Sequence, residues 1–579
     1  MPPGPLPAAP VSRPSRIKKG PHGLPCTLHT GSGPARLSRR APPLGGPRSR
    51  GLRPLGVFLS ILFGVLALLS VGSRPAGATT YVVTTLFDLS GTSVTVTDGS
   101  LRAAILYADN HAGTTITFTP GLSGTILLGY NLPPLTADMT ITGPGASVVA
   151  VDGRLKFQPF AIHAGVTATL SGLTIQSGGN PFGTIDGSGV FNEGNLTLIG
   201  YTLTGNTSNA FGGGIYNFGD ALTLIGCTLT GNSSKGGGGG VYNYNGRLAL
   251  TDCTLAGNIA ESGASTTCYG GGVCNNSGTL TLTGCTLNEN TAFDGGGVYD
   301  SGTATLTGCT LTGNEALNIG GGVCNFGLTT LTGCTLTGNS SKGGGGVFNY
   351  VGTLTLTGCT LTGNTAAADG GGGVYNLGTA TLTDDILYGD SASVSGAEFS
   401  GTINATYCDI AGLPATPDGT HNFGADPLLS ALGSYGGPTQ TCALLPSSPC
   451  LGAGSPVSGH TADQRGVPIP QGGRYDIGAF ESRGFTVKAT QGSGQSAPVG
   501  TAFALSLTAT VTANVSPEPV AGGLLTFTGP TGGASATFSP DPALIGGGGG
   551  ASVTATANGV IGAPTPSPPT PWRAAPPTA

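Results

Sequence analysis

The sequence predicts an all-β protein dominated by a right-handed parallel β-helix with coils of about 25 residues. Three observations predict this fold. Marker residues of a repeat between residues 190 and 376 recur 24 to 27 positions apart, with one spacing of 32. Segments such as Thr279–Thr283 alternate Thr and Leu, which is the period of a half-buried strand. Gly triplets precede the Val or Ile of the repeat and disfavour helical arrays.

Each coil is expected to contain three short strands, with the patterns Gly-Val-Tyr-Asn, Thr-Leu-Thr-Leu-Thr and Cys-Thr-Leu-Thr. Coils stacked in register about 4.8 Å apart bring like residues into columns. We expect an Asn column at a turn, bonded to backbone or to the next Asn. We expect a Cys column of mostly free thiols in the core, since in-register side chains point the same way. The columns comprise Asn206, Asn232, Asn258, Asn290, Asn314, Asn339 and Asn364, and Cys227, Cys253, Cys285, Cys309, Cys334 and Cys359.

The distribution of charge limits the classes of partner. Residues 1–78 contain eleven of the 22 Lys and Arg residues and no Asp or Glu. The remainder therefore has eleven basic and 27 acidic residues, a net charge of −16. Such a chain gives no support for binding to nucleic acid or to an anionic membrane. The scattered His residues lack the spacing of a metal site, so we expect neither metal nor cofactor.

Residues 1–78 are interpreted as a basic, disordered leader followed by a signal peptide. The apolar run 55–71 precedes the small residues Ala76-Gly77-Ala78, so we predict cleavage after Ala78. This predicts a secreted or cell-surface protein that is not an integral membrane protein after cleavage. A single N-terminal membrane anchor is the alternative, although the run is slightly short for a membrane span.

Residues 79–113 are expected to form an N-terminal cap. The stretch Ser100-Leu101-Arg102 with Ala104 and Ile105 resembles a module of bacterial surface β-helices that carries the motif Cys-Ser-Leu-Arg-Glu-Ala-Ile, although Gly99 and Ala103 depart from it. The resemblance implies an amphipathic helix over the first coil, which an open solenoid end requires. Residues 114–425 are then the β-helix, with about twelve coils at the spacing of stacked strands. Its repeats resemble those of polymorphic outer-membrane proteins.

Residues 426–484 contain Asp-Pro-Leu-Leu, Tyr-Gly-Gly-Pro-Thr, Asp-Gln-Arg-Gly and Asp-Ile-Gly-Ala-Phe-Glu in order. This series resembles the choice-of-anchor module of secreted bacterial β-helix proteins, which implies a C-terminal cap. Asp463 and Arg465 can pair within it. A catalytic role for Asp463, Arg465, Asp476 and Glu481 is the alternative. Cys442 and Cys450 depart from the pattern of that module and lie eight residues apart in an extracytoplasmic context, so we predict a Cys442–Cys450 disulfide.

Residues 485–560 alternate again and resemble a bacterial immunoglobulin-like module, so the predicted fold ends in a partial immunoglobulin-like β-sandwich. The composition changes abruptly to a Pro-rich tail at residues 561–579. We therefore predict that the module is truncated, with an unpaired sheet edge.

The sequence predicts a non-catalytic adhesin or structural protein whose partner is an extracellular glycan or another cell-surface molecule. A polysaccharide lyase or glycoside hydrolase is the alternative, because related solenoids host such enzymes when ionisable groups converge on one face. The candidates for such a site are Asp384, Asp385 and Asp390; Asp385 falls in the Cys column and is expected to point inward. Ice or surface binding through the outward Thr residues is a further alternative.

Overall fold

The structure is a computed structural model that describes residues 79–88, 97–179, 186–261, 269–394, 396–413 and 420–562. It contains a parallel β-solenoid of about eleven turns, spaced about 26 residues apart, followed by a small antiparallel sheet region. The predicted all-β parallel solenoid is therefore confirmed. The predicted leader and signal peptide lie outside the described residues, and so does most of the Pro-rich tail.

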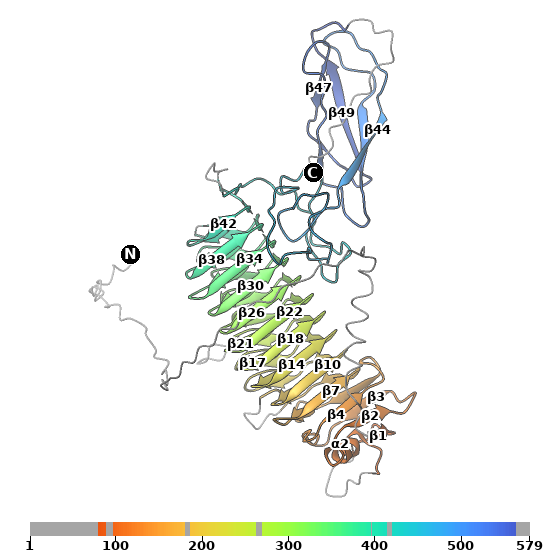
Figure 1. Cartoon of the computed structure of the whole chain (residues 1–579), viewed down its shortest axis with the longest axis vertical. Coiled ribbons are helices and arrows are strands. Elements are labelled where there is room, and N and C mark those ends of the chain that lie inside the picture. Colours follow the sequence, from red (N-terminus) through yellow and green to blue (C-terminus); the bar gives the residue numbers. More distant parts are fainter. Residues whose placement is uncertain are drawn as a thin grey trace, which may run out of the picture. The chain divides into compact units, whose positions relative to one another are not determined.

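The solenoid is built from four parallel sheets, which we call A to D, with one strand of a sheet in each coil. In Figure 1 the strands of sheet A follow one another in sequence order from orange to teal. Sheet A comprises β1 (Thr80–Val83), β2 (Thr114–Phe118), β4 (Met139–Thr142), β7 (Thr167–Ser171), β10 (Asn195–Ile199), β14 (Ala221–Ile225), β18 (Arg247–Thr251), β22 (Thr279–Thr283), β26 (Thr303–Thr307), β30 (Leu328–Thr332), β34 (Thr353–Thr357), β38 (Thr379–Thr383) and β42 (Asn404–Thr406). Sheet B comprises β3 (Gly124–Leu127), β5 (Val149–Asp152), β8 (Thr174–Gln176), β11 (Thr202–Thr204), β15 (Thr228–Thr230), β19 (Thr254–Ala256), β23 (Thr286–Asn288), β27 (Thr310–Thr312), β31 (Thr335–Thr337), β35 (Thr360–Thr362), β39 (Ile386–Leu387) and β43 (Asp409–Ile410).

The other two sheets complete the coils of the repeat. Sheet C comprises β6 (Phe160–Ile162), β9 (Val190–Asn192), β13 (Ile215–Phe218), β17 (Val241–Tyr244), β21 (Val273–Asn276), β25 (Val298–Asp300), β29 (Val323–Asn325), β33 (Val347–Asn349), β37 (Val374–Asn376) and β41 (Phe399–Ser400). Sheet D comprises β12 (Thr207–Ser208), β16 (Ser233–Ser234), β20 (Ile259–Ala260), β24 (Thr291–Asp294), β28 (Glu315–Ile319), β32 (Ser340–Ser341), β36 (Thr365–Ala366) and β40 (Ser391–Ala392). The prediction of three strands per coil therefore missed sheet D. Its strands are mostly two residues long, and their inward residues are small ones such as Ser234 and Ala260, so they carry no Leu–Thr alternation.

The core of the solenoid follows from the alternation in the sequence. In β22 the residues Leu280 and Leu282 are fully buried, while the Thr residues beside them are exposed. The Val or Ile of the sheet C strands from β9 to β37, and the Cys before most sheet B strands from β15 onward, fill the rest of the interior. Burying one such Leu stabilises the fold by about 1.5–3 kcal/mol. Stability therefore accumulates coil by coil.

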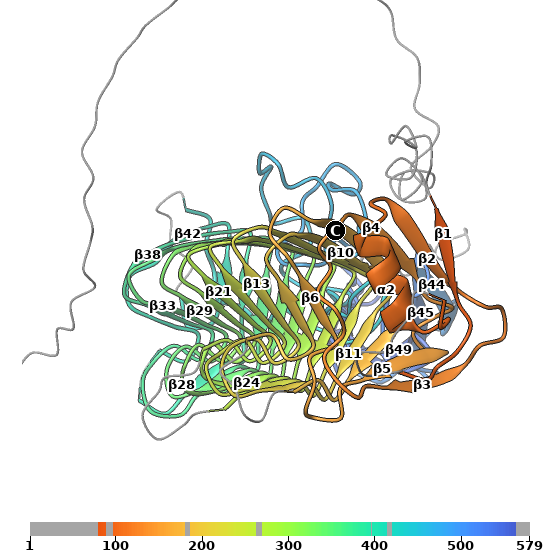
Figure 2. The same ribbon diagram turned by 90° about the horizontal axis from the view of Figure 1, so that it is seen from below.

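One helix, α2 (Leu101–Asp109), occurs in the described chain and is the helix that the sequence predicts there. Ser100 caps it, because its hydroxyl accepts a hydrogen bond from the amide of Ala103. Leu101 and Ile105 join the apolar core of the first coils, and Figure 2 shows α2 beside the strands of that end. Arg102 forms an ion pair with Asp88 at 2.7 Å. The helix therefore shields core residues at the start of the solenoid.

Residues 426–484 were expected to close the end of the solenoid, but they also pack along its side. The outward column of sheet B that includes Thr335 and Thr360 forms their docking surface. Thr335 Oγ1 donates to Gln464 Oε1 at 2.6 Å, and Thr360 Oγ1 accepts from the amide of Ala479 at 3.0 Å. The physical reason is that short Thr side chains on adjacent coils leave room for a second layer of backbone. The segment therefore braces several coils laterally.

The antiparallel region contains one sheet of four strands and one of two. Together they bury an apolar core that includes Val511, Phe527 and Val553. The strands are β44 (Phe485–Gln491), β45 (Leu507–Ala513), β49 (Gly550–Ala557) and β47 (Ala536–Ser539) in the first sheet, and β46 (Leu524–Leu525) and β48 (Ala543–Leu544) in the second. β44 and β47 each pair with one neighbour within the described residues, so they are the edges of the larger sheet. Whether this region is an incomplete immunoglobulin-like module stays a prediction.

Candidate functional site

The adjacent acids Asp384 and Asp385 point to different environments. Asp384 has a positive φ of 57°, and its carboxylate accepts hydrogen bonds from the amide and hydroxyl of Ser455, in the segment packed outside the coil. Burial raises the pKa of Asp384 to about 6. Asp385 is fully buried and accepts from the amides of Cys359 at 2.6 Å and Thr383 at 2.9 Å. The pair therefore does not form one shared site.

Asp385 occupies a position of the Cys column. Elsewhere in that column the amide of one coil donates to the sulfur of the next, as from Cys309 to Cys334 Sγ at 3.4 Å. In the coil after Cys359 the residue in this column is Asp385, and its carboxylate accepts the equivalent hydrogen bond from the Cys359 amide. Burial raises the pKa of Asp385 well above its usual range, and the neighbouring thiol adds to the shift. The predicted column residues Cys227, Cys253, Cys285, Cys309, Cys334 and Cys359 are all buried and free.

The predicted Asn column forms a hydrogen-bonded ladder, which we call the first ladder. Asn290 is typical: its Oδ1 accepts from the amide and Nδ2 of Asn258, and its Nδ2 donates to Asn314 Oδ1 at 2.9 Å. The same Nδ2 donates to the carbonyl of Leu255 at 3.0 Å. Every polar atom of the side chain is thus satisfied in the buried turn. The first ladder comprises Asn206, Asn232, Asn258, Asn290, Asn314, Asn339 and Asn364.

Asp390 is the final member of the first ladder. Its Oδ1 accepts from the amide of Asn364 at 2.6 Å and from Nδ2 of Asn364 at 2.9 Å. Its Oδ2 is buried and accepts no hydrogen bond from a donor in the described residues. Glu398 lies beside it and accepts from the amides of Gly389 and Asp390. Burial raises the pKa of both carboxyl groups, and the proximity of two acids favours a shared proton.

A second ladder runs through sheet C and was not anticipated from the sequence. Asn217 Nδ2, for example, donates to Asn243 Oδ1 at 2.7 Å and to the carbonyl of Asp220. The signal was present in the sequence, because the last residue of each Gly-Val-Tyr-Asn strand is as uniform as the predicted column. The members are Asn192, Asn217, Asn243, Asn275, Asp300, Asn325, Asn349 and Asn376.

Asp300 interrupts the second ladder because a carboxylate cannot donate to Asn325. Thr329 compensates: its hydroxyl lies 3.0 Å from Asp300 Oδ2 and 3.0 Å from Asn325 Oδ1. The equivalent inward residue of sheet A is Ala304 in the coil before and Leu354 in the coil after. Burial raises the pKa of Asp300, while its hydrogen bonds oppose the shift. Thr329 therefore stands at an inward position of sheet A that is apolar in the neighbouring coils, because Asp300 replaces an Asn of the second ladder.

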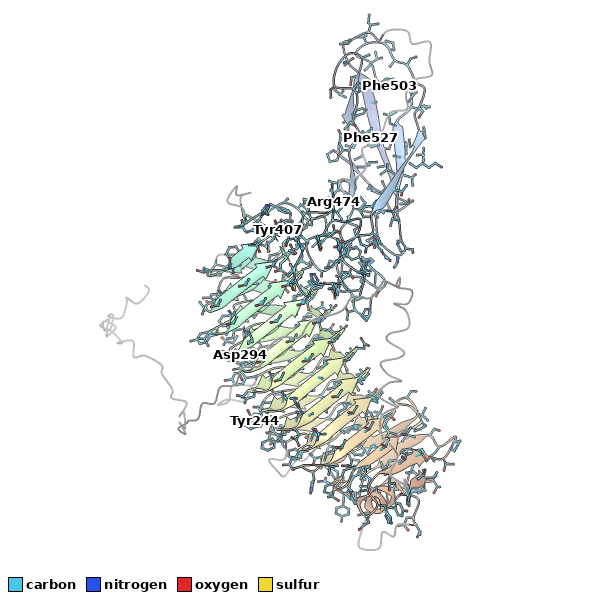
Figure 3. The ribbon with its side chains drawn as sticks, in the orientation of Figure 1. Tyr244, Asp294, Tyr407, Arg474, Phe503 and Phe527 are labelled. Carbon is cyan, nitrogen blue, oxygen red and sulfur yellow. The ribbon has the colours of Figure 1, made fainter. Side chains whose placement is uncertain are left out.

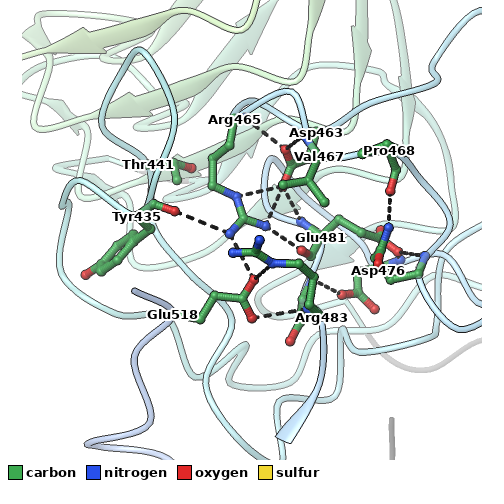
Figure 4. A network of polar contacts seen from close by, with 12 residues as sticks. Tyr435, Thr441, Asp463, Arg465, Val467, Pro468, Asp476, Glu481, Arg483 and Glu518 are labelled. Atoms are coloured by element: carbon green, nitrogen blue, oxygen red, sulfur yellow. Dashed lines mark hydrogen bonds and ion pairs between the residues drawn. The ribbon is translucent and has the colours of Figure 1, made fainter. Parts of the chain in front are cut away.

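The remaining predicted acids belong to a buried network around Arg465, shown in Figure 4. Arg465 pairs with Asp463 at 2.7 Å and with Glu518 at 3.0 Å, and its guanidinium lies 3.5 Å above the centre of the Phe480 ring. Glu518 also binds Arg483 at 2.6 Å. Glu518 lies between β45 and β46, so the network ties residues 426–484 to the antiparallel region.

Glu481 and Asp476 stand beside this network. The amide of Asp476 donates to Glu481 Oε2 at 3.0 Å, and the amide of Gln471 donates to Oε1 at 2.6 Å. Burial raises the pKa of Glu481 to about 8, and the charge of Asp476 adds to the shift. Burial likewise raises the pKa of Asp476 to about 6. The four residues considered for catalysis are thus brought together, but backbone amides and Arg465 already bind the carboxylate oxygens of the three acids.

The predicted Cys442–Cys450 disulfide is not formed in the structure, where both cysteines are free and buried. Cys450 is directed elsewhere: its thiol donates to Asp409 Oδ2 at 3.2 Å. Asp409 is fully buried in β43 and also accepts from the amide of Ala425 at 3.0 Å. Cys450 therefore hydrogen-bonds to a carboxylate that is distant in the sequence rather than to Cys442.

The outer face of sheet A carries a regular array of Thr residues. Over the five strands from β22 to β38, fourteen of the fifteen outward positions are Thr, in register from coil to coil. Leu328 is the exception. The array results from Leu–Thr alternation repeated without a change of register.

A comparison with protein-family models finds no match, and a search of curated proteins finds no similar sequence. Among the described residues, no group of three or more His, Cys, Asp or Glu side chains could hold a metal ion. In the same part of the chain, no helix is long and apolar enough to cross a membrane. The class that the fold itself defines is a parallel β-solenoid.

Proposed function

We propose that this chain is a secreted or cell-surface solenoid that binds a partner through its long lateral faces and catalyses no reaction. One observation carries the proposal: the three acids that the sequence singles out in the last coils are engaged apart from one another. Asp384 binds Ser455, Asp385 stands in the Cys column, and Asp390 ends the first ladder. A hydrolase or lyase needs ionisable groups that converge on an open face. The resemblances to a choice-of-anchor and an immunoglobulin-like module support a role at the cell surface.

The test is an assay for cleavage. The exported chain is incubated with pectin, alginate, chondroitin and xylan, and new reducing ends or unsaturated products are measured. We expect none. Activity that disappears in Asp385→Asn or Asp390→Asn, with an unchanged melting temperature, would overturn the proposal. N-terminal sequencing of the exported protein tests the predicted cleavage after Ala78.

A second candidate function is binding to ice or another flat crystalline surface, and the Thr array of sheet A favours it. Its hydroxyl and methyl groups repeat at the spacing of stacked coils, about 4.8 Å. Thermal hysteresis measured on the exported chain tests this candidate. A hysteresis that is lost in Thr281→Tyr and Thr305→Tyr, which disrupt the flat face, would support it.

A further inference from the structure

Almost all aromatic residues of the repeat lie on one side of the solenoid, which we call the aromatic face. Of the fourteen Phe and Tyr residues between residues 190 and 376, twelve lie on sheet C or in the residues that flank its strands. Sheet A, in contrast, presents Thr. The aromatic face comprises Phe191, Phe211, Tyr216, Phe218, Tyr242, Tyr244, Tyr269, Tyr299, Phe326, Phe348, Tyr350 and Tyr375.

The rings of the first coils form two parallel rows. In the inner row, Tyr216 stacks on Phe191 at 5.6 Å and on Tyr242 at 5.4 Å, with interplanar angles of 3° and 6°. In the outer row, Phe218 stacks on Tyr244 at 5.6 Å. The outer rings are exposed, Phe218 by 43% and Tyr244 by 36%. Figure 3 shows Tyr244 at the edge of the solenoid that sheet C forms.

The rings of the later coils continue the series. Tyr299 contacts Tyr269 at 4.4 Å and Phe326 at 5.4 Å, and Phe326 contacts Tyr350 at 5.1 Å. Tyr350 is 44% exposed. The contacts run from coil to coil because the same strand position recurs once per turn. The aromatic face is therefore a one-dimensional array along the direction in which the coils stack.

The polar residues between the rings of the first coils and the rings of the later coils are uncharged. Asn276 and Ser301 separate the outer rings, and Asn276 Nδ2 donates to the Tyr242 hydroxyl at 2.7 Å. In the two outward columns of sheet C, from β9 to the residue after β37, the single charged residue is Glu193. The chain from residue 79 onward has a net charge of −16. Apart from Glu193, the aromatic strip is thus uncharged, although the protein as a whole is acidic.

We infer that the aromatic face binds a neutral polysaccharide chain that lies along the stacking direction of the coils. This inference rests on the proposed binding function and names its partner. Exposed rings pack against the C–H groups of sugar rings, while Tyr hydroxyls and amides bond to sugar hydroxyls. A polymer with a regular repeat matches an array that repeats once per coil. A polyanion would be repelled by the net negative charge of the protein.

The experiment uses affinity electrophoresis of the exported chain in gels that contain hydroxyethylcellulose, glucomannan or alginate. The ring variant combines Phe218→Ala, Tyr244→Ala and Tyr350→Ala, which remove exposed rings without touching the core. The matched control combines Ile259→Ala and Leu317→Ala, apolar residues of sheet D that are exposed by 42% and 44%. We expect retention by at least one neutral polymer, a loss of at least tenfold in affinity for the ring variant, and no change for the control. Melting curves verify that both variants remain folded.

Four outcomes would overturn the inference. Equal retention of the ring variant and the wild type would remove the aromatic face as the binding site. Retention by alginate alone, or by none of these polymers, would reject a neutral partner. Dimerisation of the wild type that is lost in the ring variant, measured by light scattering, would make a second copy of this chain the occupant. If retention fails in the sheet D control instead, the assignment is wrong while the proposed binding function stands.

Discussion

The pairing of Thr329 with Asp300 can be tested by a double-mutant cycle. Thr329→Val keeps the shape of the side chain but removes the hydroxyl within 3.0 Å of both Asp300 Oδ2 and Asn325 Oδ1. Asp300 Oδ2 then loses its donor, whereas Asn325 Oδ1 keeps the amide of Gly327. A buried acceptor left without a donor costs about 1–3 kcal/mol, and a charged one costs more. We therefore expect Thr329→Val to lower the free energy of unfolding by about 2–4 kcal/mol. Thr305→Val, on the exposed face of the preceding coil, is the control and should change stability little.

Asp300→Asn should rescue this loss, because an amide at position 300 can donate to Asn325 as in the other coils. We expect the double variant to unfold within about 0.5 kcal/mol of the wild type, which is a coupling of neighbouring residues. Urea unfolding followed by circular dichroism, with hydrogen exchange of the amides around residues 298–332, measures both effects. The reasoning is refuted if Thr329→Val leaves stability unchanged, or if the double variant is as unstable as the single one.

Four further outcomes are expected. Asn290→Ala should cost about 3 kcal/mol or more, because several buried donors and acceptors lose partners, and urea titration measures it. Gly296→Ala should prevent the coils from stacking, because the added Cβ would lie 2.5 Å from a backbone oxygen. Gly226→Ala places its Cβ in open space and should cost only about 1 kcal/mol, because the residue has a positive φ. Comparison of the circular dichroism of the two variants tests this. Arg465→Met should destabilise the junction by about 3–5 kcal/mol and speed proteolysis of residues 485–562. Because the pKa of Glu481 rises from about 4.5 in the unfolded chain to about 8 in the folded one, it contributes stability that is fully present below pH 4.5 and is lost as the pH rises through about 8. In Glu481→Gln the melting temperature should therefore depend less on pH over that range.

The solenoid could be predicted because its information is repeated. A period near 25 residues, inward Leu residues and uniform columns specify the coil before any side chain is placed. The first ladder and the buried Cys column follow from the same columns. The second ladder was overlooked because its Asn residues end a strand and were interpreted as part of the strand pattern. Sheet D was overlooked because two-residue strands of small residues carry no periodic signal.

Contacts between distant segments could not be predicted from periodicity. The packing of Gln464 against Thr335 joins residues 129 positions apart, and no repeat relates them. The same holds for Cys450, whose partner Asp409 lies 41 positions away. The alternative of a catalytic site at Asp384 and Asp385 depended on their adjacency in sequence. Their side chains diverge because Asp384 adopts a left-handed backbone conformation at the turn.

The two Asn ladders make the solenoid electrically directional. In every link described, Nδ2 of one coil donates to Oδ1 of the following coil, from Asn206 toward Asp390 and, with a break after Asp300, from Asn192 toward Asn376. The side-chain amide dipoles therefore add head to tail, as peptide dipoles do in an α-helix. Their positive ends point toward the last coils. At that end the first ladder terminates in the carboxyl group of Asp390, which accepts hydrogen bonds from Asn364 and donates none to a further coil. An acidic group at the positive end of the ladder matches the preference for acidic residues at the N-terminus of a helix.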